Sequence, residues 1–288
     1  MNNNSEVKKR VIIFGCGRVG KMAAKWLGPD CELIGFTDND QEKWGRAFGG
    51  VKIFSPADAV RQGPDLIWIA IVNRSACSSV EKQLMDMGYN GKIYNIDALR
   101  EVVDLRLAAL RMIAEEVRHR QIPGEMAELG VYRGRFAAEM NRLFPERKLY
   151  LFDTFEGFDQ RDIDVELDHG FSRAQAGGFN DTSESVVRDS LPHPDRAVFK
   201  KGYFPDTAAG IDEYFALVSI DADLYQPVYE GMKYFYPKLS SGGCIIVHDY
   251  NNAHFKGVGE AVRRYCREHM IFPVPLCDLH GSAIIVKQ

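Results

Sequence analysis

The sequence predicts an α/β protein built from two tandem doubly wound Rossmann-like domains joined by a long helix. Two stretches, residues 10–26 and 125–144, each begin with an apolar run, pass through a glycine turn and continue as a helical pattern. After both starts, short β-branched runs alternate with helical stretches, which is typical of parallel sheets covered by helices. We expect one domain over residues 1–98, a linker or lid helix over 99–122, and a second domain over 123–288.

The composition narrows the classes of function. Hydrophobic residues make up 45% of the 288 residues and the formal net charge is -4, which excludes a disordered chain and favours neither nucleic acid nor an anionic membrane as a partner. No apolar run approaches the roughly 20 residues that span a bilayer, and no signal peptide is visible at the start, so we expect a cytoplasmic protein. The six cysteines show no CxxC spacing, which gives a zinc site no support.

In the first domain, apolar runs predict strands and polar-apolar periodicity predicts helices between them. Ser55 before Pro56 predicts an N-cap followed by proline at the first helical position. The expected strands are residues 10–14, 32–36, 51–54, 65–72 and 92–96, and the expected helices include 56–62 and 78–87.

Residues 98–120 lack glycine and proline and carry an apolar stripe at near-helical spacing, formed by Leu107, Leu110, Ile113 and Val117. This pattern predicts one long helix that Pro123-Gly124 ends.

In the second domain we expect a mostly parallel sheet closed by a terminal strand pair. The strands are predicted at residues 125–129, 148–153, 197–201, 215–221 and 244–248, with the pair at 272–276 and 282–286. Residues 156–182 show no clear period, and a loop of that length inside a compact domain is usually functional.

The first glycine turn is Gly15-x-Gly17-x-x-Gly20, placed between a strand and a helix. Such a turn lets a pyrophosphate approach the helix N-terminus, and Asp38 at the end of the next strand stands where a ribose-binding acid is expected. The run over residues 38–56 resembles Rossmann-like modules of polysaccharide-biosynthesis proteins. Two interpretations stay open: NAD(P) or nucleotide binding, and a structural or regulatory domain.

The second glycine turn has a different pattern, with Glu128 two places before Gly130 and a further glycine at Gly134. It resembles motif I of class I S-adenosylmethionine-dependent methyltransferases. Glycines let the chain pass close beneath a cofactor, and a carboxylate can accept a hydrogen bond from its ammonium group or a nearby amide. Asp153 ends the following strand, where a carboxylate can accept ribose hydroxyls.

Four downstream motifs resemble the macrocin O-methyltransferase family. They are Asp153-Thr-Phe-Glu-Gly-Phe158, Lys201-Gly-Tyr-Phe-Pro-Asp-Thr207, Ser219-Ile-Asp-Ala-Asp-Leu-Tyr225 and Gly242-Gly-Cys-Ile-Ile-Val-His-Asp-Tyr250. The resemblance covers residues 123–288. It implies methyl transfer from S-adenosylmethionine to a sugar hydroxyl on a small molecule, usually with magnesium, a cofactor site that includes Thr154 and Phe204, and a homo-oligomer.

Asp221, Asp223 and Asp249 follow two predicted strands, and the carboxyl ends of parallel strands are where ligands bind. Converging carboxylates suit Mg²⁺, which would fix an acceptor hydroxyl and lower its pKa. The family pattern implies metal ligands at Asp221, His248 and Asp249, with Asp223 as general base. His248 stands where the family usually has an acid, and histidine suits other metals better. If no metal binds, His248 becomes a candidate base.

Two other functions remain as alternatives. An NAD(P)-dependent nucleotide-sugar oxidoreductase, or a nucleotide-sensing binding protein, would use the first domain. The oxidoreductase requires a Tyr-x-x-x-Lys pair near the first glycine turn, yet the two matches begin at Tyr229 and Tyr234, in the second domain. A non-catalytic module with two degraded sites is the other alternative.

Overall fold

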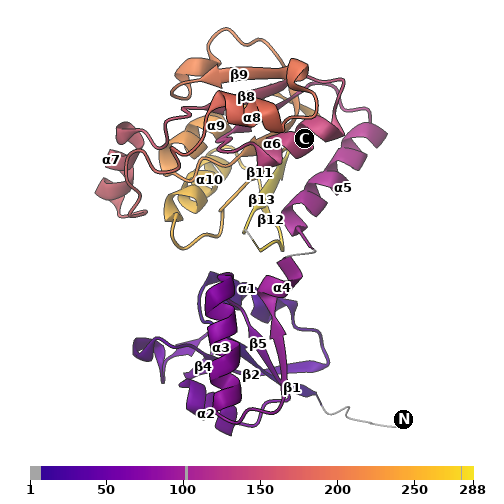
Figure 1. The fold of residues 1–288 in the computed structure, drawn as a ribbon. Helices are drawn as coiled ribbons and strands as arrows, with labels where there is room; N and C mark the ends of the chain where they lie inside the picture. The colour runs from indigo at the N-terminus through magenta and orange to yellow at the C-terminus, as the bar shows by residue number, and fades with distance from the viewer. Residues whose placement is uncertain (1–7, 101–102, 280) are drawn as a thin grey trace. The chain divides into compact units, whose positions relative to one another are not determined.

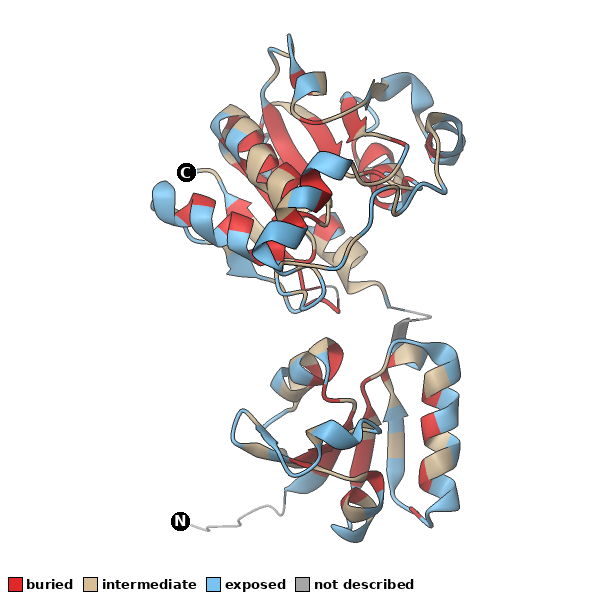
Figure 2. Ribbon diagram, turned by 90° about the vertical axis from the view of Figure 1, so that its left-hand side faces the viewer, coloured by how far each residue is buried: buried red, intermediate tan, exposed pale blue. Residues whose placement is uncertain are grey.

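The computed structural model describes residues 8–100, 103–279 and 281–288. The chain forms two compact units, Met1–Asp104 and Leu105–Gln288, and each is a sheet with helices packed against it (Figure 1). In both units the buried residues gather in the central strands and on the inward faces of the helices (Figure 2). The predicted α/β class is confirmed. In the described part of the chain, no helix is long and apolar enough to cross a membrane.

The first unit contains a six-stranded sheet in the order β3-β4-β2-β1-β5-β6, parallel except for β3, which pairs antiparallel with β4. Ser55 caps α2 as predicted, since its hydroxyl accepts the amide of Asp58 at 3.1 Å. The strands are β1 (Lys9–Phe14), β2 (Cys31–Thr37), β3 (Ala47–Phe48), β4 (Val51–Phe54), β5 (Leu66–Ile69) and β6 (Lys92–Asn95). The helices are α1 (Arg18–Trp26), α2 (Pro56–Arg61), α3 (Arg74–Asp86) and α4 (Ile96–Arg100), with a short 3₁₀ turn, η1 (Gln41–Lys43).

The second unit contains a seven-stranded sheet in the order β12-β13-β11-β10-β7-β8-β9. Strands β7 to β11 are parallel, and β13 pairs antiparallel with β11 and with β12, so the predicted terminal pair is confirmed. The strands are β7 (Glu125–Leu129), β8 (Leu149–Asp153), β9 (Ala197–Lys201), β10 (Phe215–Ile220), β11 (Leu239–Val247), β12 (Val274–Pro275) and β13 (Ala283–Val286). The helices are α5 (Leu105–His119), α6 (Arg135–Leu143), α7 (Gln160–His169), α8 (Glu184–Ser190), α9 (Tyr225–Lys238) and α10 (Lys256–Glu268), with 3₁₀ turns η2 (Pro194–Arg196) and η3 (Asp206–Ala208).

Helices cover both faces of this second sheet. On one face α9 and α10 pack through side chains such as Phe235 and Val258. On the other face α5 and α6 pack through Leu110, Val117 and Met140. Because alternate residues of each strand contact the two helix layers, the parallel strands are apolar throughout and only their ends are left for polar chemistry.

The single helix predicted over residues 98–120 is wrong. α4 ends at Arg100, Val103 and Asp104 are not helical, and α5 begins at Leu105. Val103 is β-branched and loses side-chain freedom in a helix, while Asp104 stands just before a helix start, where aspartate is favoured. The predicted apolar stripe is confirmed: α5 packs it into the second unit.

Residues 156–182 are not irregular throughout, because α7 forms within them. Asp159 caps α7 and Gly170 ends it with a left-handed backbone. Two of the positions that α7 buries are the carboxylates Asp162 and Glu166, so its inward face shows no apolar period in the sequence.

Candidate active site

The second glycine turn lies at the centre of the sheet, where β7 is flanked by β8 on one side and β10 on the other. This reversal of strand order opens a crevice at the carboxyl ends of the strands. Gly130 has φ +82°, and a Cβ there would lie 2.2 Å from the carbonyl oxygen of Asp221. The amide of Asp221 in turn donates to the carbonyl of Leu129 at 2.8 Å. The glycine is therefore required for the turn to reach the end of β10.

Asp153, at the end of β8, holds this turn by its backbone. One carboxylate oxygen accepts the amides of Val131 and Tyr132 at 2.7 and 2.9 Å, and the other accepts the amide of Phe155 at 2.7 Å. The neighbouring Thr154 hydroxyl donates to the carbonyl of Gly157 at 2.7 Å. The predicted cofactor acid thus fixes two loops at the edge of the crevice.

A cavity of about 310 Å³ occupies the crevice. It brings together eight of the residues predicted from the sequence: Gly130, Asp153, Thr154, Phe204, Asp221, Asp223, His248 and Asp249. Six aromatic residues, one from β8 and five from separate loops, form much of the remaining wall: Phe152, Tyr132, Phe158, Phe179, Tyr203 and Phe255. Aromatic faces beside a cluster of carboxylates can bind a planar base at one end and a polar group at the other.

In the second unit, two predicted cofactor residues do not line the cavity. Gly134 starts α6 with φ +76°, where a Cβ would come within 2.9 Å of Val187, so its role is to pack the turn. Glu128 is 1% exposed and accepts a hydrogen bond from Ser219 at 3.2 Å. Burial raises the pKa of Glu128 to about 8 against the opposing charge of Arg106. Its Oε2 has no hydrogen-bond partner among the described residues, which leaves an acceptor for a ligand atom or a water.

Asp221 lies at the centre of the acidic cluster and contacts two cationic side chains. Its Oδ2 is 2.9 Å from Nη2 of Arg106, and its Oδ1 is 2.8 Å from Nδ1 of His248. Burial would raise the pKa of Asp221, but these two neighbours lower it well below its usual range. Burial would likewise lower the pKa of His248, and Asp221 instead raises it to about 10. The ion pairs keep Asp221 ionised and His248 protonated at neutral pH.

Asp223 and Asp249 follow the ends of β10 and β11, and both have a left-handed backbone, with φ +58° and +56°. Strained backbone at non-glycine residues concentrates at functional sites. Burial raises the pKa of Asp223 well above its ordinary value, and the charges of Asp221 and Asp249 raise it further. Asp223 therefore takes up a proton more readily than Asp221, whose pKa is lowered.

The three predicted magnesium ligands, Asp221, His248 and Asp249, all line the cavity, and magnesium binding by them stays a prediction. Within residues 8–100, 103–279 and 281–288, no group of three or more His, Cys, Asp or Glu side chains is arranged to hold a metal ion. Both oxygens of Asp221 contact other side chains, and His248 Nδ1 lies 3.5 Å from Asp249 as well.

The sequence interpretation missed three contributors to this site. Arg106 lies on α5, beside the apolar stripe, and no motif around it in the sequence indicates that it belongs to the site. Asp162 on α7 lines the cavity and accepts the hydroxyl of Tyr203 at 2.8 Å, and burial raises the pKa of Asp162 to about 6. The signals in the sequence that could have revealed α7, and with it Asp162, are the N-cap Asp159 and the C-cap Gly170.

The third missed residue, Glu166, connects α7 to the acidic cluster. Leu224, the N-cap of α9, gives no side-chain cap. Instead the fully buried Glu166 of α7 accepts the amide of Tyr225 at 2.8 Å. A carboxylate at a helix N-terminus satisfies an orphan amide and is stabilised by the helix dipole. Glu166 thus holds the first turn of α9, directly after Asp223.

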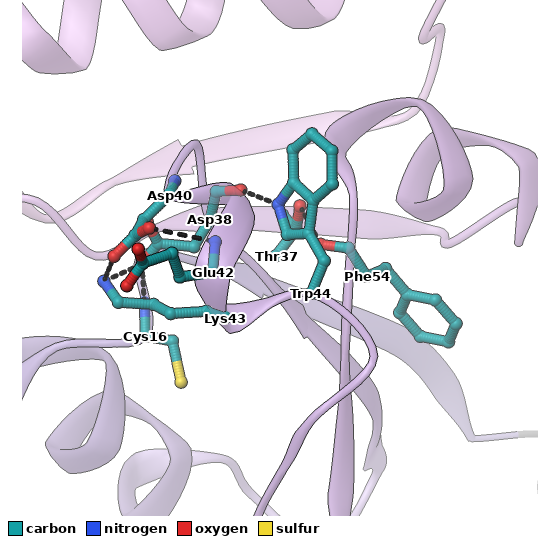
Figure 3. A network of polar contacts seen from close by, with 8 residues as sticks. All are labelled: Cys16, Thr37, Asp38, Asp40, Glu42, Lys43, Trp44 and Phe54. Atoms are coloured by element: carbon teal, nitrogen blue, oxygen red, sulfur yellow. Dashed lines mark hydrogen bonds and ion pairs between the residues drawn. The ribbon is translucent and has the colours of Figure 1, made fainter.

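The first glycine turn is also held by an aspartate, Asp38, which contacts Cys16 and Lys43 (Figure 3). Asp38 directly follows β2 and accepts the amides of Cys16 at 2.9 Å and Asp40 at 3.0 Å. Lys43 lies 3.0 Å from the same carboxylate, and the Trp44 indole donates to the Asp38 carbonyl. Burial would raise the pKa of Asp38, but the two amides and Lys43 together hold it below its ordinary value. Asp38 is therefore engaged on both oxygens.

The three glycines of this first turn differ in how strictly the structure requires a glycine. Gly15 has φ +101°, and a Cβ on Gly20 would lie 1.8 Å from the carbonyl oxygen of Gly15, so both are fixed by packing. A Cβ on Gly17 would meet nothing within 4 Å. NAD(P) binding at this turn stays a prediction.

A seven-stranded sheet with a central glycine turn, a clamping acid and an acidic edge defines a Rossmann-like methyltransferase fold. The family model described as Macrocin-O-methyltransferase (TylF) matches residues 73–287, and the chain belongs to that family. A second model, described as C2185-like, N-terminal, matches residues 7–94. The Tyr-x-x-x-Lys matches both lie in α9 of the second unit, outside the domain that an oxidoreductase would use.

Two curated relatives are similar to the chain in sequence, and one solved structure is similar to it in fold. The chain is 30% identical over 157 residues to demethyldecarbamoylnovobiocin O-methyltransferase of Streptomyces niveus, a match that spans 50% of this chain and 60% of that protein. It is 29% identical to 8-demethyl-8-(2,3-dimethoxy-alpha-L-rhamnosyl)-tetracenomycin-C 4'-O-methyltransferase of Streptomyces olivaceus, over 64% of this chain and 73% of that protein. The O-methyltransferase NovP is similar in fold, with a TM-score of 0.53, 24% identity, and 64% and 79% of the two chains covered.

Proposed function

We propose that the second unit is an S-adenosylmethionine-dependent O-methyltransferase that acts on a hydroxyl of a sugar or glycosylated small molecule. The observation that carries the proposal is one cavity lined both by the glycine turn with its clamping acid and by the acidic cluster of Asp221, Asp223 and Asp249. Family membership and the named activities of the relatives on glycosylated metabolites support it.

The residues present fit the cofactor. S-adenosylmethionine supplies an electrophilic methyl group when bound and leaves as S-adenosylhomocysteine. The cofactor would lie against the backbone of the turn at Gly130. Phe204 and Tyr203 would offer apolar faces to the adenine base of the cofactor. Thr154 and Asp153 lie at the same edge for its ribose, and the unpartnered Oε2 of Glu128 lies beneath the turn.

We assign the role of general base to Asp223. The bound cofactor would supply the methyl group for the acceptor hydroxyl, and the Asp223 carboxylate would accept the proton that this hydroxyl releases. A carboxylate with a raised pKa accepts that proton more readily than an ordinary one. His248 is protonated beside Asp221, so it acts as a cationic hydrogen-bond donor rather than as the base.

Binding and turnover test the proposal separately. Titration calorimetry with S-adenosylhomocysteine should give one site per chain, and transfer of a tritiated methyl group from S-adenosylmethionine should be detected with members of a panel of deoxysugar glycosides. Absence of S-adenosylhomocysteine binding at millimolar concentration would end the proposal. Titration with NAD⁺ and NADP⁺ in the same instrument tests the prediction for the first unit, and gel filtration tests the predicted homo-oligomer.

A further inference from the structure

The acidic cluster brings three carboxylates to one end of two adjacent strands. Asp249 is 5% exposed and Asp221 retains 22% side-chain exposure. Carboxylates held this close and this far from water require compensating positive charge, because desolvation and mutual repulsion otherwise disfavour their ionised forms. The source of that charge decides whether the site needs a metal.

Arg106 supplies one positive charge from α5. Its Nη2 is 2.9 Å from Oδ2 of Asp221, and its side chain is only 13% exposed. The guanidinium lies 4.1 Å from the ring centre of Phe136, so an aromatic face also holds it. This is a built position: α5 packs against α6, which carries Phe136, and the charge cannot move into water without breaking both contacts.

His248 occupies the other oxygen of Asp221 from the end of β11. Its Nδ1 lies 2.8 Å from Oδ1 of Asp221 and 3.5 Å from Asp249, so it stands between the two carboxylates. Each oxygen of Asp221 therefore contacts a different nitrogen-bearing side chain. A divalent ion bound at Asp221 would have to displace Arg106 or His248, and if Arg106 stayed in place the ion would meet the charge of its guanidinium.

We propose that Arg106, with His248, takes the place of a divalent cation in this chain, so that the acidic cluster works without bound metal. Arg106 acts as a positioning residue: it does not line the cavity, and it acts by holding the Asp221 carboxylate in place beside Asp223 and the acceptor. The part that concerns turnover rests on the proposed function, whereas the part that concerns metal binding does not.

Mn²⁺ binding, followed by electron paramagnetic resonance, tests this directly on the full chain. The wild type and Arg106→Lys, which keeps the charge, should leave Mn²⁺ in its free form up to millimolar concentration. Arg106→Met keeps an apolar contact with Phe136 but removes the charge, and it should bind Mn²⁺ at least ~10-fold more tightly than the wild type. The double variant Arg106→Met/Asp221→Asn is the matched control and should lose the gained binding.

Two results would overturn the inference. One is Mn²⁺ binding by the wild type that Asp221→Asn abolishes, and the other is no gain of binding in Arg106→Met while S-adenosylhomocysteine still binds to that variant. Methyl transfer should also be the same with and without EDTA, and a loss of turnover in EDTA that Mg²⁺ restores would contradict us. Failure of S-adenosylhomocysteine to bind the wild type would count against the proposed function alone, since the Mn²⁺ titration needs no turnover.

Discussion

The two glycine turns of this chain share one local design and differ in what surrounds it. In each, an aspartate at the end of the second strand accepts an amide of the turn: Asp38 accepts that of Cys16, and Asp153 accepts those of Val131 and Tyr132. Lys43 then pairs with Asp38, whereas Asp153 opens onto a cavity that reaches the acidic cluster. The shared pattern therefore encodes a backbone clamp, and the neighbours of the clamp decide whether it serves a ligand.

The largest expected effect is on turnover, when a residue of the second unit's cavity is compared with one of the first turn. Asp223→Asn removes the proposed base and should lower methyl transfer by ~10²- to 10⁴-fold, while S-adenosylhomocysteine binding stays nearly unchanged. The comparison variant Asp38→Asn changes the clamping acid of the first turn and should leave turnover as it is. Equal turnover in Asp223→Asn and wild type would remove Asp223 from the mechanism.

The second largest effect is expected on cofactor affinity, when the clamping aspartate of either turn is removed. Asp153→Ala leaves three backbone amides without their acceptor and should weaken S-adenosylhomocysteine binding by about 100-fold, because the turn that holds the cofactor loses its anchor. Asp38→Ala removes an equivalent anchor in the first unit and should not change that affinity. Calorimetry on both variants measures the contrast, and an equal loss in both would break the comparison.

Asp162 tests the cost of burying a carboxylate in the cavity wall of the second turn. Its pKa is raised from 3.8 to about 6, so the native state binds more protons than the unfolded state between these values, and the free energy of unfolding falls as pH rises through that window. Asp162→Asn should therefore stabilise the ligand-free protein above pH ~6, by at most about 3 kcal/mol, and change little near pH ~4. Urea unfolding at both pH values measures this. Asp164→Asn, at an exposed position of the same helix, is the control and should show no such pH dependence.

The smallest effect is expected at Gly17, the open position of the first turn. Because a Cβ there would meet nothing within 4 Å and the backbone has φ −93°, Gly17→Ala should change the free energy of unfolding by less than ~1 kcal/mol. Gly130→Ala, where a Cβ would lie 2.2 Å from a carbonyl oxygen, should destabilise the second unit far more. Thermal unfolding of the two variants measures the contrast. A large loss of stability in Gly17→Ala would contradict the open space that the structure shows at Gly17.

Much of the fold was predictable because the parallel strands are buried on both faces and appear as apolar runs. Strands such as β7 and β9 begin and end where the sequence predicts. The site residues that follow strand ends, Asp153, Asp221 and Asp249, were predictable for the same reason. Arg106 and Glu166 were not, because each lies on a helix and acquires its role from a partner more than fifty residues away in the chain, a pairing that only the packed structure specifies.

The end of α4 at Arg100 and the hidden α7 show the limits of prediction at the level of secondary structure. Val103 and Asp104 interrupt the helical pattern of residues 98–120, and buried carboxylates on α7 replaced the apolar period that would have marked it. In α7 the local pattern was overridden by residues whose partners lie elsewhere in the chain.

The Glu166 carboxylate has a practical meaning for anyone who wishes to redirect this protein to another acceptor. The segment around α7 is the obvious piece to exchange between relatives, since it walls the cavity. Yet that piece carries the cap of α9, and α9 starts two residues after Asp223. An exchanged segment without a carboxylate at position 166 would leave the Tyr225 amide without its acceptor and would loosen the turn that carries Asp223. The exchanged segment must therefore supply another acceptor for that amide.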